Sequence, residues 1–253
     1  MHRLSVVLAG LLVAASAAIA APAGPAEATV TPTCDGRIAT KFLTSPGTLT
    51  GTNGNDVLVG SSGADVITGN GGNDTICAGD GNDHVDGNSG NDLIIGDREN
   101  LLDCSGSFGA DVLTGGAGED TIRDLCGSNQ ADGGSGRDSI SVSGTALGGG
   151  GNDSFVRATN GFTQGCEPCV VGFADGGSGN DADVRVSGGV ATGGSGNDEV
   201  FAFQQGDEAR GGSGNDTVGG ITGVDVTLNG GSGNDTCNEV GGDDTLISCE
   251  TVV

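Results

Sequence analysis

The chain lacks most of the side chains on which enzymes rely. It has no tyrosine or tryptophan, one methionine and two histidines in 253 residues. General acid–base catalysis usually recruits histidine, lysine, tyrosine or carboxylates with perturbed pKa values. Beyond the first 28 residues, His84 is the only histidine and Lys41 the only lysine. This composition favours a function other than catalysis.

Cationic residues are equally scarce. Nine lysine and arginine residues stand against 34 aspartates and glutamates, which gives a formal net charge of −25 at pH 7. Nucleic acids and anionic membranes are bound by clustered cationic side chains, so we expect neither as a partner. Self-repulsion of this size opposes a compact chain, and a folded state therefore needs counter-charge from outside. Divalent cations supply that charge most economically.

A long hydrophobic run occurs only near the N-terminus, from Leu4 to Ile19. It follows the basic residue Arg3 and leads into small residues that suit signal peptidase after Ala20 or after Ala28. The run is short for a membrane anchor, and prolines come after it. We therefore expect residues 1–28 to be a signal peptide that is cleaved, and the mature chain to be secreted, extracellular and not inserted in a membrane.

Glycine, in contrast, supplies 53 residues, a composition typical of disordered chains unless the sequence is periodic. Here the phrase Gly-Gly-x-Gly-x-Asp-x-hydrophobic-x recurs, and from Gly51 to Ile95 it runs back to back every nine residues. A nine-residue period predicts an all-β parallel β-roll, or β-solenoid, of about twelve coils without helices. Its inward hydrophobic positions, two residues after the aspartates, are expected to be Leu58, Ile67, Ile76, Val85, Ile94, Leu113, Ile122, Ile140 and Phe155.

The period doubles in the second half of the chain. The phrase Gly-Gly-Ser-Gly-Asn-Asp begins at Gly176, Gly193, Gly211 and Gly230, which are 17, 18 and 19 residues apart. Two nonapeptides make one coil, so this spacing predicts one metal-binding turn per coil, with an ordinary turn such as 204–207 on the opposite edge. The first half should carry metal on both edges, with aspartates 56, 74 and 92 stacked on one edge and 65 and 83 on the other.

The chemistry of these turns suits calcium, a hard cation that takes six to eight oxygen ligands in flexible geometry. Glycine reaches positive φ at little steric cost, so a glycine turn can aim its carbonyls at one point while the aspartate closes the site. The expected cofactor is therefore several Ca²⁺ ions, each held between stacked turns.

The segment Gly69-Asn70-Gly71-Gly72-Asn73-Asp74-Thr75-Ile76-Cys77 and its neighbours resemble the RTX, or hemolysin-type, calcium-binding repeats. The resemblance implies a parallel β-roll with calcium between turns. It also implies that the metal ligands are Asp56, Asp65, Asp74, Asp83, Asp92, Asp111, Asp120, Asp138, Asp153, Asp181, Asp198, Asp216 and Asp235. Three departures stand out, because Asn129 replaces an aspartate and Asp183 and Cys237 occupy hydrophobic positions. The toxin and protease activities of family members are not implied, since we expect a Sec-type start and no second domain.

These patterns divide the chain into five parts. After the signal peptide, we expect an N-terminal cap over 29–48 and a roll with calcium turns on both edges over 49–156, interrupted by an insertion near 96–105. A cysteine-containing loop should follow over 157–175. The roll should then continue over 176–253 with one calcium turn per coil and end in a disulfide-linked cap.

All eight cysteines lie in the predicted mature chain, and an even number in an exported protein suggests disulfides. Because each coil of a solenoid contacts only its neighbours, we expect sequential pairing. The predicted pairs are Cys34 with Cys77, Cys104 with Cys126, Cys166 with Cys169, and Cys237 with Cys249. The alternatives for Cys166-Glu167-Pro168-Cys169 are a redox motif or half of a zinc site.

The sequence therefore predicts a secreted, non-enzymatic calcium-binding protein whose β-roll folds on binding several calcium ions. Two alternatives stay open. One is a calcium-dependent extracellular adhesin or matrix protein, whose ligand the sequence does not specify. The other is an enzyme that acts on an extracellular polysaccharide, for which the catalytic residues are missing from the sequence pattern.

Overall fold

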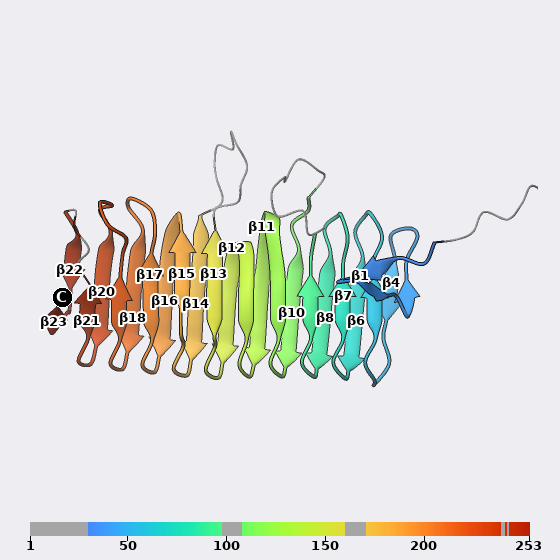
Figure 1. Ribbon diagram of the computed structural model, residues 1–253, viewed down its shortest axis with the longest axis horizontal. Helices are drawn as coiled ribbons and strands as arrows, with labels where there is room; N and C mark the ends of the chain where they lie inside the picture. The colour runs from blue at the N-terminus through green and yellow to red at the C-terminus, as the bar shows by residue number, and fades with distance from the viewer. Residues whose placement is uncertain (1–29, 98–107, 160–170, 239–240, 242) are drawn as a thin grey trace, which may run out of the picture. The chain divides into compact units, whose positions relative to one another are not determined.

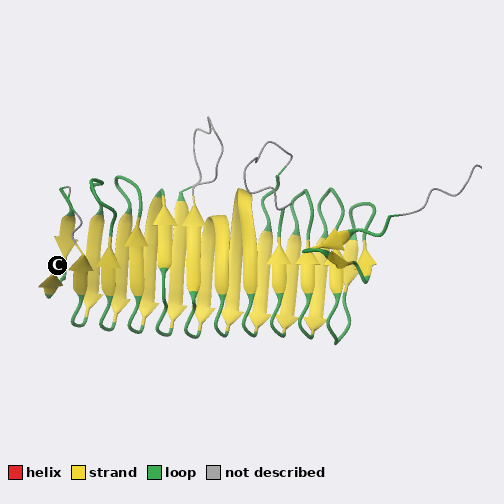
Figure 2. Cartoon of the chain, in the orientation of Figure 1, coloured by secondary structure: helices red, strands yellow, loops and turns green. Residues whose placement is uncertain are grey.

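The computed structural model describes residues 30–97, 108–159, 171–238, 241 and 243–253. Residues 31–253 form one compact unit, and within it the described chain is built from strands and turns (Figures 1 and 2). The strands are β1 (Thr33–Cys34), β2 (Arg37–Ile38), β3 (Lys41–Phe42), β4 (Thr48–Thr50), β5 (Val57–Val59), β6 (Val66–Gly71), β7 (Thr75–Cys77), β8 (His84–Ser89), β9 (Leu93–Ile95), β10 (Val112–Ala117), β11 (Thr121–Ser135), β12 (Ser139–Gly150), β13 (Phe155–Thr159), β14 (Gly172–Ser178), β15 (Val184–Ser187), β16 (Gly189–Ser195), β17 (Glu199–Ala202), β18 (Glu208–Ser213), β19 (Thr217–Gly219), β20 (Thr227–Ser232), β21 (Thr236–Asn238), β22 (Thr245–Ile247) and β23 (Thr251–Val252).

Parallel pairing repeats once per coil. Val57 pairs with Thr75, and Thr75 pairs with Leu93, so β5, β7 and β9 stack 18 residues apart. On the opposite side of the coil, β6 pairs with β8 in the same parallel sense. Two nonapeptides therefore make one coil, and the predicted all-β parallel β-roll is confirmed. No helix that could span a membrane occurs in the described part of the chain.

The core consists of two rows of apolar side chains, one from each side of the coil, stacked in register. One row is Leu58, Ile76, Ile94, Ile122, Ile140, Val156, Val184, Val200, Val218 and Cys237. The other is Leu49, Ile67, Val85, Leu113, Ala131, Ala146, Ala174, Ala191, Ala209 and Leu228. All of them are buried. The core is thin, but each coil extends it by two side chains.

Longer strands compensate for the alanines of the second row. In β12, β13, β15 and β17 a second apolar residue points inward, and these residues pair in register as Val142, Ala158, Val186 and Ala202. All four are 0–1% exposed. Because protein interiors are close-packed, the smaller volume on one side of the coil has to be filled from the other.

The prediction that Phe155 points into the core is wrong. Phe155 is half-buried, and its neighbour Val156 is the buried residue that pairs with Ile140. One extra residue separates the motif aspartate from the core position here, and the next coil has the same insertion. There Asp183 takes a left-handed φ of 68°, and Val184 enters the core in its place. Cys237, the second departure at a hydrophobic position, is fully buried and completes the first row.

Several predicted boundaries shift. Residues 33–38 form a β1–β2 hairpin, but β3 and β4 already pair with β5 and β6, so the first coil begins inside the predicted cap. The predicted loop 157–175 is strand at both ends, in β13 and β14. The roll has about ten turns rather than twelve, because two coils take 28 residues instead of 18 and residues 33–38 form a separate hairpin.

Two disulfides close the ends of the roll. Cys34 bonds to Cys77 and Cys237 to Cys249, each with a Cα–Cα distance of 5.7 Å, and both are predicted pairs. Cys126 is also disulfide-bonded. Its predicted partner Cys104, the pair Cys166 and Cys169, and the signal peptide lie outside the described residues.

Candidate metal-binding ladders

One edge of the roll carries a continuous ladder of ten aspartates, one from each successive turn. The backbone N–H of each of the first nine aspartates donates to Oδ1 of the aspartate one coil further on, at 2.7–2.9 Å. The ladder is Asp56, Asp74, Asp92, Asp120, Asp138, Asp153, Asp181, Asp198, Asp216 and Asp235. These hydrogen bonds fix one oxygen of each carboxylate and leave the other, Oδ2, directed into the turn.

A shorter ladder follows the opposite edge. The amide of Asp65 donates to Asp83, that of Asp83 to Asp111, and that of Asp111 to Oδ1 of Asn129, at 2.8–3.0 Å. The ladder ends at Asn129, whose Nδ2 donates to the Cys126 carbonyl at 2.6 Å. The two stacks predicted for the first half of the roll, 56–74–92 and 65–83, are thus both present.

The same edge is different in the second half of the roll. Asp207 closes the predicted ordinary turn of residues 204–207, in which its amide donates to the Gln204 carbonyl at 3.0 Å. Its carboxylate accepts backbone hydrogen bonds from Gly188, Gly189, Phe203 and Gln204. Because both oxygens are occupied by amides, this turn has no carboxylate oxygen directed at a metal.

Most ladder aspartates, in contrast, hold a buried oxygen for which the described residues provide no hydrogen-bond donor. All thirteen motif aspartates are 0–7% exposed. In eleven of them Oδ2 finds no hydrogen-bond partner among the residues that the structure describes. The exceptions are the first rungs, where Thr52 donates to Asp56 and Ser61 to Asp65. Burying a carboxylate oxygen without a partner is costly, so eleven such atoms in register point to a ligand.

Nine of these oxygens, all on the long ladder, face a space that only glycine leaves open. A Cβ added to Gly69 would lie 2.4 Å from Oδ2 of Asp74 and 2.8 Å from the carbonyl oxygen of Gly87, one coil further on. The same pairing of a carboxylate and a carbonyl recurs at Gly87, Gly115, Gly133, Gly148, Gly176, Gly193, Gly211 and Gly230. We call this space a cradle. Its donors are oxygens only, from two adjacent coils, and such a set fits calcium.

Burial also changes the pKa values of these carboxyls. Burial raises the pKa of Asp74 from 3.8 to about 6, and repulsion by Asp92 and Asp56 adds to the shift. Burial, with repulsion by neighbouring aspartates, likewise raises the pKa of Asp83 and of Asp181 to about 7. Ionising the stacked carboxylates is therefore unfavourable until a cation neutralises them.

Asp56, at the start of the ladder, behaves differently. Burial alone would raise its pKa, but hydrogen bonds from Thr52 and Thr40 and the charge of Lys41 outweigh that effect, and its pKa is lowered. The first rung is thus satisfied by the protein itself.

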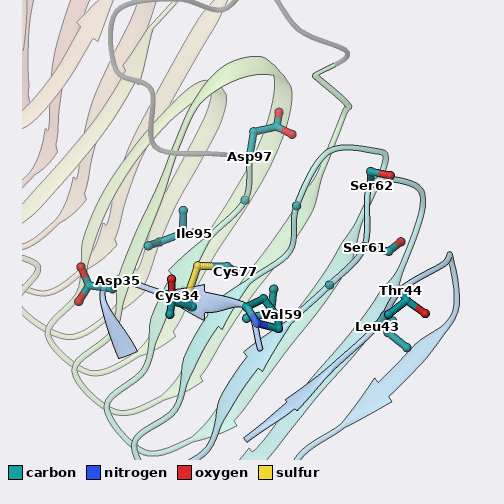
Figure 3. Close-up of a pocket in the computed structure, with 15 residues that line it drawn as sticks. Cys34, Asp35, Leu43, Thr44, Val59, Ser61, Ser62, Cys77, Ile95 and Asp97 are labelled. Atoms are coloured by element: carbon teal, nitrogen blue, oxygen red, sulfur yellow. A yellow bond between two sulfur atoms is a disulfide. The ribbon is translucent and has the colours of Figure 1, made fainter. Parts of the chain in front are cut away.

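A cleft of about 530 Å³ lies beside the N-terminal hairpin (Figure 3). Its walls include the Cys34–Cys77 disulfide, Val59, Ile95 and Asp97. The two cysteines are bonded to each other and so offer no free thiol. The only histidine of the roll, His84, is exposed on β8. The cleft therefore does not combine a nucleophile with a histidine base.

The aspartate positions could be read from the sequence, but three other acidic residues could not. Glu250 caps the long ladder by accepting from the Asp235 amide, and Asp97 and Asp124 lie beside Asp111. None of the three occupies the motif position. A signal for Glu250 was present, since it follows Cys249, and the predicted disulfide of Cys249 with Cys237 brings it to the last motif turn.

Comparison with known families agrees with this geometry. The model of the RTX calcium-binding nonapeptide repeat matches residues 50–85, 78–100, 105–140, 190–218 and 225–246, which together make up more than half of the chain. In the comparisons with curated proteins and with solved structures, nothing matches significantly. With its nonapeptide turns, stacked aspartates and glycine cradles, the chain belongs to the RTX calcium-binding repeat family.

Proposed function

We propose that this protein is a secreted, non-enzymatic calcium-binding protein whose β-roll folds when it binds several calcium ions. The observation that carries the proposal is the set of eleven buried Oδ2 atoms without a partner in the described structure, nine of which face a glycine cradle. A cation held there would satisfy the carboxylate oxygen and the carbonyl together. It would also offset the charge of −25.

The position of the donors couples binding to folding. In each cradle the carboxylate comes from one coil and the carbonyl from the next, as with Asp74 and Gly87. Such a site does not exist in the unfolded chain, so the free energy of binding becomes free energy of folding. The unfolded chain keeps its carboxylates solvated and far apart, which favours it whenever calcium is absent.

Far-UV circular dichroism during a calcium titration from chelator tests this proposal on residues 29–253, with disulfides intact and then reduced. We expect a cooperative transition from coil to β-structure as calcium is added. Isothermal titration calorimetry should give several ions per chain. The proposal would be contradicted if the protein kept its full β-structure in excess chelator and calorimetry detected no calcium binding.

Export is supported by the two disulfides at the ends of the roll and by the leader-like residues 1–28. Disulfides persist in oxidising compartments. Fractionation of producing cells and N-terminal sequencing of the protein test this part. We expect the protein in the medium with its N-terminus after Ala20 or Ala28; an uncleaved protein retained in the cytoplasm contradicts it.

One surface feature favours the adhesin or matrix role as a second candidate. The guanidinium of Arg185 lies 5.5–5.9 Å from the ring centroids of Phe155, Phe201 and Phe203. This cluster lies on the outer face of β13, β15 and β17, where Arg157 and Arg185 line a small pocket in an otherwise acidic protein. Binding of extracellular polysaccharides to the wild type but not to Arg185→Ala would support this role. Turnover of those polysaccharides would favour the enzyme instead.

A further inference from the structure

We infer that Asp97, Asp111 and Asp124 form a three-carboxylate calcium site at the end of the shorter ladder, built largely from residues outside the repeat motif. Asp111 is a motif aspartate, whereas Asp97 follows β9 and Asp124 lies within β11. The inference deepens the proposed function, because it names a calcium site in addition to those of the ladders. It rests on the proposal that the protein binds calcium, but the site uses none of the residues of the ladder of ten aspartates.

The three carboxylates converge. One oxygen of each lies within 4.8 Å of the corresponding oxygens of the other two. Calcium–oxygen distances are about 2.3–2.6 Å, so two ligands of one ion lie up to about 5 Å apart. A single calcium ion can therefore contact all three side chains. The ligand atoms are oxygens only, which disfavours zinc and other metals that prefer nitrogen or sulfur.

The side chains are buried, and their oxygens are unsatisfied. Asp97, Asp111 and Asp124 are 4%, 1% and 3% exposed. Oδ2 of Asp111 and of Asp124 has no hydrogen-bond donor within the described ranges, and the Gly109 amide is the one described donor near the carboxylate of Asp97. Exposed acidic clusters are common on protein surfaces without any ion. A buried cluster of three carboxylates with so few donors requires a counter-ion or protons.

The site differs from an ordinary cradle in one donor, because a carboxylate oxygen stands where a cradle has a backbone carbonyl oxygen. At Gly60, on the same edge, an added Cβ would meet the carbonyl oxygen of Ala78 at 1.9 Å and Oδ2 of Asp65 at 2.9 Å. At Gly96, one coil after Ala78, the Cβ would meet Oδ2 of Asp124 at 2.1 Å and Oδ2 of Asp111 at 2.9 Å. A carboxylate thus occupies the place of the backbone carbonyl.

Asp124 also accounts for the Asn129 departure from the motif. Asn129 keeps the ladder hydrogen bond through Oδ1, but its Nδ2 donates to Cys126 and offers no second oxygen to an ion. Asp124 stands five residues earlier, where the motif has its first glycine. The negative charge that the motif loses at Asn129 is therefore present at Asp124.

Charge distinguishes this site from the others. A ladder cradle presents one carboxylate oxygen and one carbonyl oxygen to the same space, whereas the Asp97–Asp111–Asp124 site presents three carboxylates. The affinity of oxygen sites for calcium rises with the number of charged ligands. This site should fill first in a titration and hold its ion most tightly.

The test compares calcium binding by the purified protein and by the double variant Asp97→Asn/Asp124→Asn, using isothermal titration calorimetry. Asp35→Asn is the matched control, because Asp35 is exposed and asparagine tolerates its φ of 48°. We expect the double variant to bind one ion fewer. Its tightest class of sites should be weakened at least about tenfold, the loss that even indirect partners of metal ligands cause.

Each outcome decides between the two proposals. Loss of one tight ion with the remaining ions and the β-transition retained supports the site. If the double variant binds as many ions as the wild type, and its tightest sites have the same affinity, the site is overturned while the ladder proposal stands. If the wild type binds one ion only, and the double variant none, the site stands and the ladder proposal fails. Should the double variant not fold, the single variant Asp97→Asn gives the same readout, since asparagine keeps a side-chain oxygen that can accept from the Gly109 amide.

Discussion

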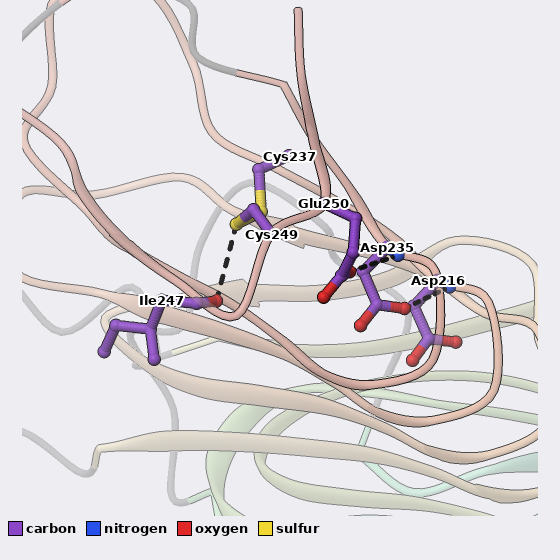
Figure 4. The surroundings of a disulfide bond; sticks show 6 residues. All are labelled: Asp216, Asp235, Cys237, Ile247, Cys249 and Glu250. Carbon is purple, nitrogen blue, oxygen red and sulfur yellow. Dashed lines mark hydrogen bonds between the residues drawn. A yellow bond between two sulfur atoms is a disulfide. The ribbon is translucent and has the colours of Figure 1, made fainter.

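Glu250 completes the ladder that Asp56 begins, because its Oε2 accepts a hydrogen bond from the Asp235 amide at 2.7 Å (Figure 4). A glutamate takes the place of the next aspartate at the last turn. The Cys237–Cys249 disulfide holds the C-terminal segment beside this turn. Near the same turn, the Ser248 carbonyl faces the cradle of Gly230 and Asp235. The end of the roll is thus built to close the last cradle.

Glu250→Ala should therefore destabilise the end of the roll. The substitution leaves the partly buried Asp235 amide without its charged acceptor, which costs about 1–3 kcal/mol. For a domain of this size, each kcal/mol lowers Tm by about 2–4 °C. Thermal unfolding in saturating calcium measures the effect. Glu250→Gln keeps the acceptor oxygen and should retain most of the stability, so equal losses in the two variants would contradict the role of the hydrogen bond.

Gly133→Ala should abolish a calcium site in the middle of the long ladder. The new methyl group would lie 2.5 Å from Oδ2 of Asp138 and 2.7 Å from the Gly148 carbonyl, where the ion is expected. Calorimetry should show at least one ion fewer and a higher calcium midpoint for folding. Gly54→Ala is the matched control, since its methyl group would meet only Thr52 Oγ1, at 3.8 Å. Equal calcium binding by both variants would show that the cradle is not the site.

Removing the N-terminal disulfide should weaken the fold without removing the ladder. Cys34 and Cys77 are 43 residues apart and tie the β1–β2 hairpin to β7. Loss of a cross-link of this kind typically costs about 2–4 kcal/mol. We expect Cys34→Ala/Cys77→Ala to unfold at lower temperature in calcium and to bind the same number of ions. Loss of most ions in this variant would mean that the disulfide organises the ladder.

The sequence predicts this fold well because the period is local and repeated. Each aspartate fixes a turn, and a residue two or three positions later fixes the strand. The prediction failed for Phe155 because one extra residue in the turn moves every following side chain to the other face, as expected for a strand. A single-residue insertion leaves the motif itself intact and so gives no signal at that position.

The acidic residues outside the motif could not be predicted for a different reason. Asp97 and Asp124 are separated by an insertion, and only the coil register brings both beside Asp111. Sequence spacing reveals ligands that recur at the nine-residue period. It does not reveal a side chain that takes the place of a backbone carbonyl in a single coil, as Asp124 does.

Acid should stabilise the calcium-free roll and weaken calcium binding. The pKa of Asp74 is raised to about 6 and those of Asp83 and Asp181 to about 7, against an ordinary value of 3.8 in the unfolded chain. Between pH 4 and 7 the folded state therefore binds more protons than the unfolded state, so its stability falls as pH rises. In chelator, circular dichroism should show more β-structure at pH 5 than at pH 8, whereas calcium affinity should be higher at pH 8, because protons compete for the same carboxylates. A calcium-free roll that is more stable at pH 8 would mean that these carboxyls ionise without penalty, which the burial of their unpartnered oxygens contradicts.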